Sequence, residues 1–128
     1  MRDSFDFKIE GPAFTMSKSY WIVIEKAIRE EARLRNLSLP FPSKNMVFAV
    51  DVSFYFTLEG IFPLGKRDLD NLTKPILDTI FNCRKKGVTA VLFELDDTYV
   101  RELHLQKKMV ATKDDQCTMV SIKWREMS

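Results

Sequence analysis

An alternating stretch at residues 47–60, VFAVDVSFYFTLEG, constrains the fold more than any other part of the chain. Its apolar positions are Phe48, Val50, Val52, Phe54, Phe56 and Leu58, and the positions between them are Ala49, Asp51, Ser53, Tyr55 and Thr57. Successive side chains of a β-strand point to opposite faces, so this pattern predicts a long strand with one buried side. The fold must therefore cover one face of this strand.

The remaining segments alternate between strand and helix patterns. Residues 20–36 place apolar side chains at helical spacing, and the prolines that follow end that helix. The other expected elements are a short strand at 6–11, a second helix at 70–84, an apolar strand at 88–95, and alternating segments at 100–110 and 117–124 that suggest a terminal hairpin or strand pair. We expect a single α/β (α+β) domain over residues 1–128, with a mixed β-sheet flanked by two main helices.

Composition argues against several classes of protein. The 128 residues suit one domain, and no apolar run approaches the length that crosses a bilayer. The opening MRDSFDFKIEG alternates and carries acids, which is not the pattern of a signal peptide. Cys83 and Cys117 lack CxxC spacing, so we expect a reduced pair in a cytoplasmic protein. A net charge of +2 does not by itself identify a nucleic-acid binder.

Residues 66–78, KRDLDNLTKPILD, concentrate charged groups at the start of the second expected helix. Asp70, Lys74 and Asp78 step by four residues and would line one helix face near solvent. Asp68 lies two residues before Asp70, so both carboxylates point the same way if the chain is extended there. The geometry therefore allows two carboxylates and an ammonium to meet at one helix N-terminus. The apolar stripe of the same helix would consist of Leu69, Leu72, Ile76, Leu77 and Ile80.

Helix capping explains part of this pattern equally well. Asp and Asn are favoured N-caps, and acids near a helix start interact favourably with its dipole, by roughly 0.3–1 kcal/mol each. One cap needs one side chain, however, whereas Asp68, Asp70 and Asn71 are all present. Pro75 also falls beyond the first turn, where it would remove the hydrogen bond to Asn71 at a cost of ~3 kcal/mol. Such departures from local rules tend to occur at functional sites.

A second acidic block, FELDDTYV, follows the apolar run and contains Glu94, Asp96 and Asp97. Taken alone, this block is typical of a turn or a strand end. Taken together with Asp68 and Asp70, it offers three carboxylates from two segments for a hard cation. Mg²⁺ prefers one or two protein carboxylates and fills its other positions with water and phosphate oxygens. Because the acids repel one another without the ion, we expect metal dependence and a less stable metal-free form.

The two acidic segments and the later Lys108 form a spaced pattern. RDLDNLTKPILD at residues 67–78 supplies D-x-D-N-L-x-K and a helix, and LDDTYV at residues 95–100 supplies L-D-D-x-x-V. With the opening FKIEGPAFTMSK, this pattern resembles the RusA-type Holliday-junction resolvases, which are crossover-junction endodeoxyribonucleases. The resemblance covers most of the chain. The connection between Asp78 and Asp96 is longer than the family pattern leads us to expect.

The resemblance implies roles for individual residues. Asp68 and Asp70 match the paired catalytic carboxylates, Asp97 matches the third metal ligand, and Lys74 matches the catalytic lysine. The residues that would support this site are Asn71, Asp78 and Asp96. The implied cofactor is Mg²⁺, with Mn²⁺ as the alternative ion. The implied assembly is an α/β homodimer with two active sites, one for each of two opposed strands of a four-way DNA junction.

Local basic groups would have to bind the DNA, because the net charge is small. The candidates are Lys18, Lys66, Arg67, Arg84, Lys85, Lys86, Lys107 and Lys108. For any of these groups a solvated surface position is the simpler explanation, and for residues 84–86 a helix C-terminus also favours bases. His104, the only histidine, shares a strand face with Glu102 and Gln106, which indicates a solvated surface position.

Three functions are compatible with these residues. The first is a magnesium-dependent junction resolvase that cuts opposed strands in DNA recombination and repair. The second is a nuclease with the same chemistry on another nucleic-acid substrate. The third is a branched-DNA-binding protein in which the carboxylates are structural and nothing is cut.

Overall fold

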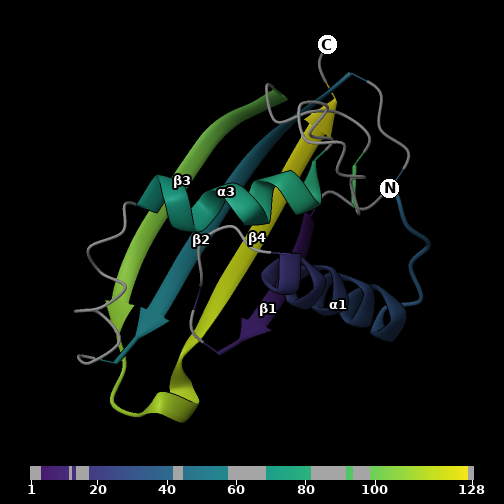
Figure 1. Ribbon diagram of the computed structural model, residues 1–128. Helices are drawn as coiled ribbons and strands as arrows, with labels where there is room; N and C mark the ends of the chain where they lie inside the picture. Colours follow the sequence, from purple (N-terminus) through teal and green to yellow (C-terminus); the bar gives the residue numbers. More distant parts are fainter. Residues whose placement is uncertain are drawn as a thin grey trace.

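Strand β2, Met46–Phe56, is the centre of a four-stranded sheet (Figure 1). The computed structural model describes residues 4–11, 13, 18–41, 45–57, 69–81, 92–93 and 99–126. β2 pairs in parallel with β3, Val100–Met109, and antiparallel with β4, Cys117–Glu126. β4 pairs on its other side with β1, Ser4–Glu10, so the strand order is β1-β4-β2-β3. The expected mixed sheet in an α+β domain is confirmed.

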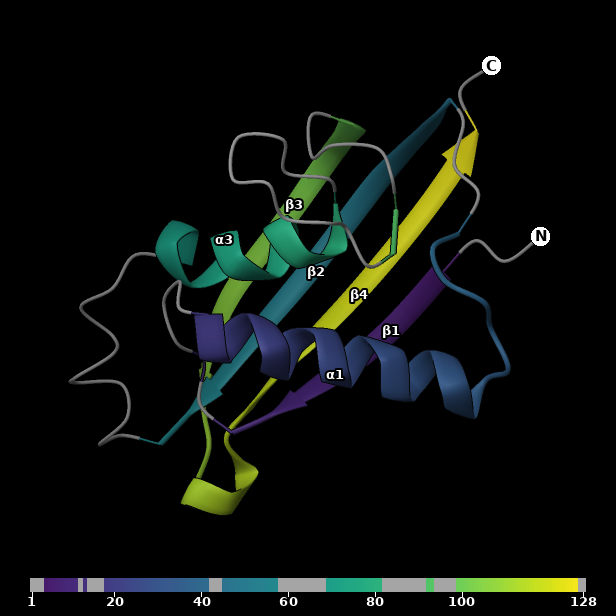
Figure 2. The same ribbon diagram turned by 45° about the vertical axis from the view of Figure 1, so that its right-hand side comes forward.

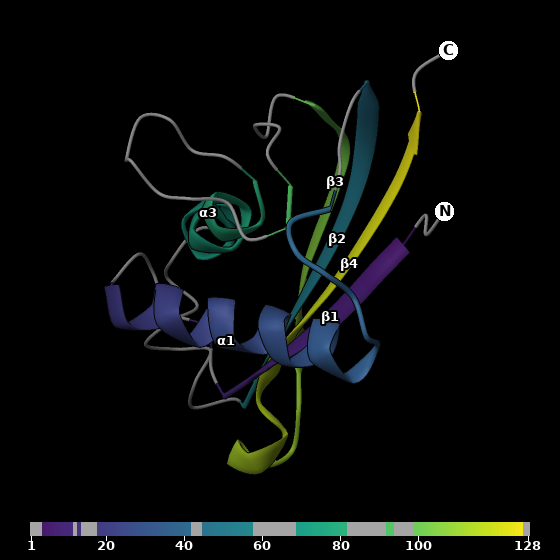
Figure 3. The ribbon, with the colours of Figure 1, turned by 90° about the vertical axis from the view of Figure 1, so that its right-hand side faces the viewer.

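Two helices cover one face of this sheet. Helix α1, Lys18–Leu34, contacts β1, and helix α3, Leu69–Ile80, lies beside α1 (Figure 2). Seen edge-on, both helices are on the same side of the strands (Figure 3). The sequence predicted that two helices flank the sheet, and the structure adds that both helices lie on the same face of it (Figure 3). It follows from β2, whose buried Phe48, Val50 and Val52 face the helices while Asp51 on the other face is exposed.

The prediction of a terminal hairpin is wrong. β3 and β4 do not pair with each other, because both pair with β2, which lies between them. The connection that includes the short 3₁₀ helix η3, Lys113–Asp115, passes the end of β2. There the Val110 amide donates to the Phe56 carbonyl at 2.8 Å, and the Thr57 amide donates to Gln116 Oε1 at 3.2 Å. These contacts at the end of β2 stabilise a connection that places β2 between its neighbours.

Aromatic rings join the C-terminal end of α3 to the end of the sheet. Phe93 is fully buried, with its ring centroid 4.6 Å from that of Phe48 and 5.2 Å from that of Trp124. Its amide donates to the Ile80 carbonyl at 3.0 Å, and it forms a parallel bridge with Phe41. Of the predicted apolar strand at 88–95, only Leu92 and Phe93 lie within the described residues, and both are buried. The cluster therefore fixes where α3 ends.

Cys117 is a free, buried thiol at the start of β4, and Cys83 lies outside the described residues. Burial raises the pKa of the Cys117 thiol, which keeps it protonated and unreactive near neutral pH. Across the described segments, neither helix has the length and apolar character needed to cross a membrane.

Candidate functional site

Helix α3 carries the D-N-x-x-K part of the motif, Asp70 to Lys74, whereas Asp68 lies outside the described residues. Its fully buried stripe of Leu72, Ile76 and Ile80 packs into the core and fixes the rotation of the helix, as the sequence predicted. The N-terminal end of α3 lies beside β3, whereas its C-terminal end points across the sheet (Figures 1 and 2). Asp70 is therefore in a first turn at the β3 edge of the molecule.

The two halves of α3 differ in their exposure. Asn71 and Lys74, three residues apart and on one side of the helix, are both exposed. From Asp78 onward the helix is buried, and the Asp78 side chain is 5% exposed. Asn71 and Lys74 thus face solvent, where they are accessible to a large ligand.

The burial of Asp78 corrects the prediction that it would lie near solvent with Asp70 and Lys74. Positions four residues apart rotate by about 40° around a helix at each step, so three of them do not share one environment. Asp78 also has an interaction partner inside the protein. Its place in the buried half of α3 indicates a supporting role in the fold rather than contact with a ligand at the exposed first turn.

Pro75 lies inside α3, at the seventh position of the helix, as the sequence predicted. Because proline has no N–H, the Asn71 carbonyl receives no helical hydrogen bond from position 75. One turn later the Thr79 hydroxyl donates to the Pro75 carbonyl at 2.7 Å. The helix thus continues through Pro75, and the missing hydrogen bond is the one that the Asn71 carbonyl would accept.

Replacing Pro75 with alanine is expected to raise the free energy of unfolding by about 1 kcal/mol. Proline in a helix interior costs ~3 kcal/mol, and loss of two buried ring carbons, at about 0.8 kcal/mol each, offsets part of the gain. Urea denaturation of both proteins measures the difference. Exposed Asn71→Ala serves as a control in the same helix, and a lower stability for Pro75→Ala would show that packing of the ring dominates.

The metal site remains a prediction. Asp68, Asp96 and Asp97 lie outside the described residues, and for Asp70 the structure describes the backbone position alone. Among the residues that are described, no group of three or more His, Cys, Asp or Glu side chains is arranged to hold a metal ion. The described set includes the side chain of none of the three predicted ligands, so it leaves their convergence untested.

The predicted DNA-binding bases lie in three different situations. Lys107 pairs in register with Phe54 on the covered face and is half-buried, whereas exposed Lys108 pairs with Tyr55 on the opposite face. The Lys108 ammonium lies 5.5 Å from the Tyr55 ring centroid. The two lysines therefore cannot contact one surface together. Lys18 is the first residue of α1, and the candidates outside the described residues are Lys66, Arg67, Arg84, Lys85 and Lys86.

Further cations were not selected by sequence reasoning. Arg101 on β3 and Lys123 and Arg125 on β4 are exposed on the sheet face that α1 and α3 leave uncovered. The signal for the β4 pair was present, because Lys123 and Arg125 alternate with buried Ile122 and Trp124. His104 is exposed, as predicted, with its Nε2 3.8 Å from Glu102 Oε2.

No protein-family model matches this chain, and no curated protein is significantly similar to it in sequence. The functional interpretation therefore depends on the motif and on the geometry described above. The described part of the candidate site consists of exposed Asn71 and Lys74, on the first two turns of α3.

Proposed function

We propose that the protein is a magnesium-dependent endodeoxyribonuclease of the RusA type, which resolves four-way DNA junctions as a homodimer. The observation that supports the proposal is that the D-N-x-x-K part of the motif lies at the start of a helix, with Asn71 and Lys74 exposed and the other end of the helix buried. If the motif only capped the helix, the exposed Lys74, one turn after Asp70, would have no role in it. The protein would act in the cytoplasm, in DNA recombination and repair.

Asp68, Asp70 and Asp97 would hold the ion. Their carboxylate oxygens are the hard donors that Mg²⁺ and Mn²⁺ prefer, so the donor set fits the cofactor. Bound Mg²⁺ supplies polarisation of the phosphodiester and a lowered pKa of the attacking water. The Asn71 amide, at the exposed start of α3, would orient a neighbouring carboxylate or the phosphate by hydrogen bonding. Asp96 would support Asp97 as its neighbour.

Lys74 would stabilise the negative charge that grows on the phosphoryl oxygens during hydrolysis. Its side chain is exposed on the second turn of α3, one turn beyond Asp70. A lysine ammonium is a compact charge with three donors, which suits an oxygen that becomes more negative in the transition state.

Replacing Lys74 with methionine is therefore expected to lower the single-turnover cleavage rate by about 10²-fold while leaving junction affinity within a few fold. Quenched-flow or gel assays with labelled junction measure the rate, and filter binding in EDTA measures the affinity. Lys26→Met, which removes an exposed lysine from α1, is the matched control. An equal rate for Lys74→Met and wild type would remove Lys74 from the mechanism.

The proposal is tested by incubating the protein with labelled four-way junction and with linear duplex, in Mg²⁺ or in EDTA. Paired nicks in opposed strands of the junction, seen only with Mg²⁺, are the expected result. Cutting of linear duplex at a comparable rate would favour a nuclease with another substrate. Binding of the junction by the protein without any cleavage would favour a non-cleaving branched-DNA-binding protein.

A further inference from the structure

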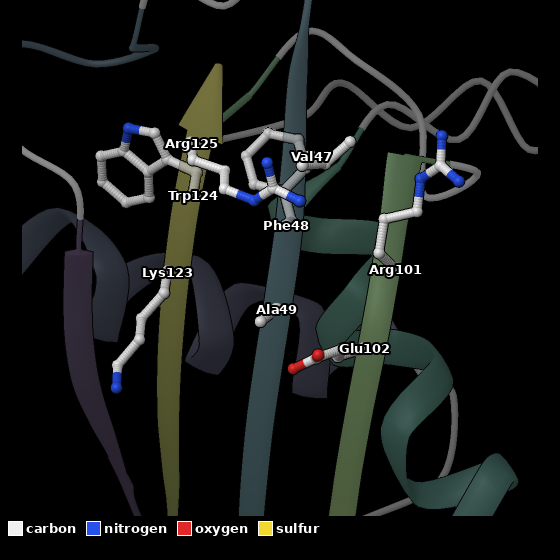
Figure 4. A pocket seen from close by; sticks show the side chains of 8 residues that line it. All are labelled: Val47, Phe48, Ala49, Arg101, Glu102, Lys123, Trp124 and Arg125. Atoms are coloured by element: carbon white, nitrogen blue, oxygen red, sulfur yellow. The ribbon is translucent and has the colours of Figure 1, made fainter. Parts of the chain in front are cut away.

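A shallow pocket lies on the sheet face opposite the helices (Figure 4). It has a volume of about 190 Å³, and its apolar floor includes Val47 and Ala49 of β2. Four charged side chains surround this floor: Arg101 and Glu102 from β3, and Lys123 and Arg125 from β4. Arg125 extends from β4 across β2, and Glu102 points toward Ala49 from the other side. We call this site the Arg125 pocket.

An irregularity in the sheet builds one wall of the Arg125 pocket. The register of β2 with β3 runs from Phe48–Val100 directly to Ala49–Glu102, so Arg101 is an extra residue with no partner on β2. In a regular strand Arg101 and Glu102 would point to opposite faces, yet both line the pocket. Such bulges re-aim side chains and are frequent next to functional sites. The bulge therefore adds a guanidinium to this face.

No carboxylate among the described residues neutralises the cations of the Arg125 pocket. Within the described part of the chain, Arg101, Lys123 and Arg125 have no carboxylate at ion-pair distance, whereas Arg29 and Arg33 of α1 each pair with a glutamate. Three cationic side chains thus surround one carboxylate, that of Glu102, whose Oε2 is 3.8 Å from His104 Nε2.

We propose that the Arg125 pocket binds backbone phosphates of a DNA arm that flanks the cleavage point. Arg101 and Arg125 come from strands on either side of β2, roughly 10 Å apart, and guanidinium groups bind phosphate oxygens in a bidentate manner. The pocket is open and shallow, which suits a polymer that brings several charges better than a small anion that needs enclosure. It faces away from α3, so it binds a part of the substrate other than the scissile phosphate. This inference rests on the proposed function for the identity of the polymer.

The test is a triple variant, Arg101→Gln, Lys123→Gln and Arg125→Gln, compared with a control of equal charge change, Lys26→Gln, Arg29→Gln and Lys113→Gln. Junction affinity in EDTA is measured between about 50 and 200 mM salt. The pocket variant is expected to bind at least about 10-fold more weakly, with a slope of log K against log salt that is smaller by about 2–3. Its kcat/KM for cleavage falls by the same factor. The control is expected to change affinity by less than about threefold, with a slope close to that of the wild type.

Equal losses of junction affinity in the pocket variant and the control variant would overturn the proposal, because they would show a general effect of net charge. A pocket variant with wild-type affinity would overturn it as well, even if the junction is still cut. If the wild type cuts no DNA but only the pocket variant loses junction affinity, the proposed nuclease function fails and DNA binding by the pocket is supported.

A second measurement uses the wild-type protein and so does not depend on a variant that folds correctly. Short duplex DNA should shift the amide NMR signals of Ala49 and Glu102. Unshifted signals at these two residues under saturating DNA would overturn the proposal, and shifts produced equally by inorganic phosphate alone would assign the site to a small anion.

Discussion

Asp70→Asn is expected to lower junction cleavage by about 10³-fold or more while leaving junction affinity within about threefold. Asparagine has nearly the same shape as aspartate but lacks the negative charge that holds a divalent ion, and loss of that ion removes both polarisation of the phosphate and activation of water. Single-turnover assays at saturating protein measure the rate. Asp70 lies in the first turn of α3, and because asparagine keeps the shape of aspartate, the substitution should not disturb the packing of that helix.

Thermal unfolding with and without Mg²⁺ gives an independent measurement of the same substitution. If the proposed site binds Mg²⁺ in the folded state, the ion should raise the Tm of the wild type by relieving repulsion between carboxylates, and should raise the Tm of Asp70→Asn much less. Asp114→Asn, an exposed acid in η3, is the control and should behave as wild type. Cleavage at the wild-type rate by Asp70→Asn would show that this carboxylate has no part in the reaction.

Phe93→Ala is expected to lower the free energy of unfolding by about 3–5 kcal/mol, the usual cost of removing a fully buried aromatic ring. The Phe93 ring is packed by Phe48 and Trp124, and also by Phe41 and Phe81, each with its centroid 5.7 Å away. Small domains are stable by only about 5–15 kcal/mol, so this variant should be close to unfolding at physiological temperature. Urea denaturation at 25 °C measures the change.

Phe93→Leu is the matched comparison, because it keeps an apolar side chain in the cluster and should cost clearly less than alanine. The ranking wild type, leucine, alanine would establish that ring packing at Phe93 stabilises the fold. A cost below about 1 kcal/mol for alanine would mean that the Phe93 segment detaches without loss of the remaining core.

The sequence predicted the structure best where the repeat of apolar residues along an element determines which of its faces is buried. Alternation from Phe48 to Phe56 assigned the covered and uncovered faces of β2 correctly, because a strand in a sheet covered on one side has only two environments. Beyond the strand the pattern did not hold for Thr57, which is buried. The stripe of Leu72, Ile76 and Ile80 fixed the rotation of α3 for the same reason. Such patterns identify which face of an element is buried. They contain no information on which elements are neighbours, and that is why the hairpin of β3 and β4 was wrong.

The candidate site shows the same limit. The spacing of Asp70, Asn71 and Lys74 was enough to locate the start of a helix and its exposed side. Helical spacing did not predict the burial of Asp78, since that depends on what packs over the C-terminal half of α3. Alternation would have separated Lys107 from Lys108, and their adjacency in the sequence suggested a cluster that the strand does not form. The Arg125 pocket required both the strand order and a bulge, neither of which a single sequence reveals.

The strand order also bears on how the chain is made. Within the described residues β1 pairs only with β4, so the first described strand enters the sheet only when the last described strand is available. Until then the apolar side of β1, with Phe5, Phe7 and Ile9, has no sheet neighbour, and nascent chains with unpaired apolar strands are prone to aggregate. Pairing of β4 joins β1 to β2, so folding of this sheet depends on contacts between segments that are far apart in the sequence.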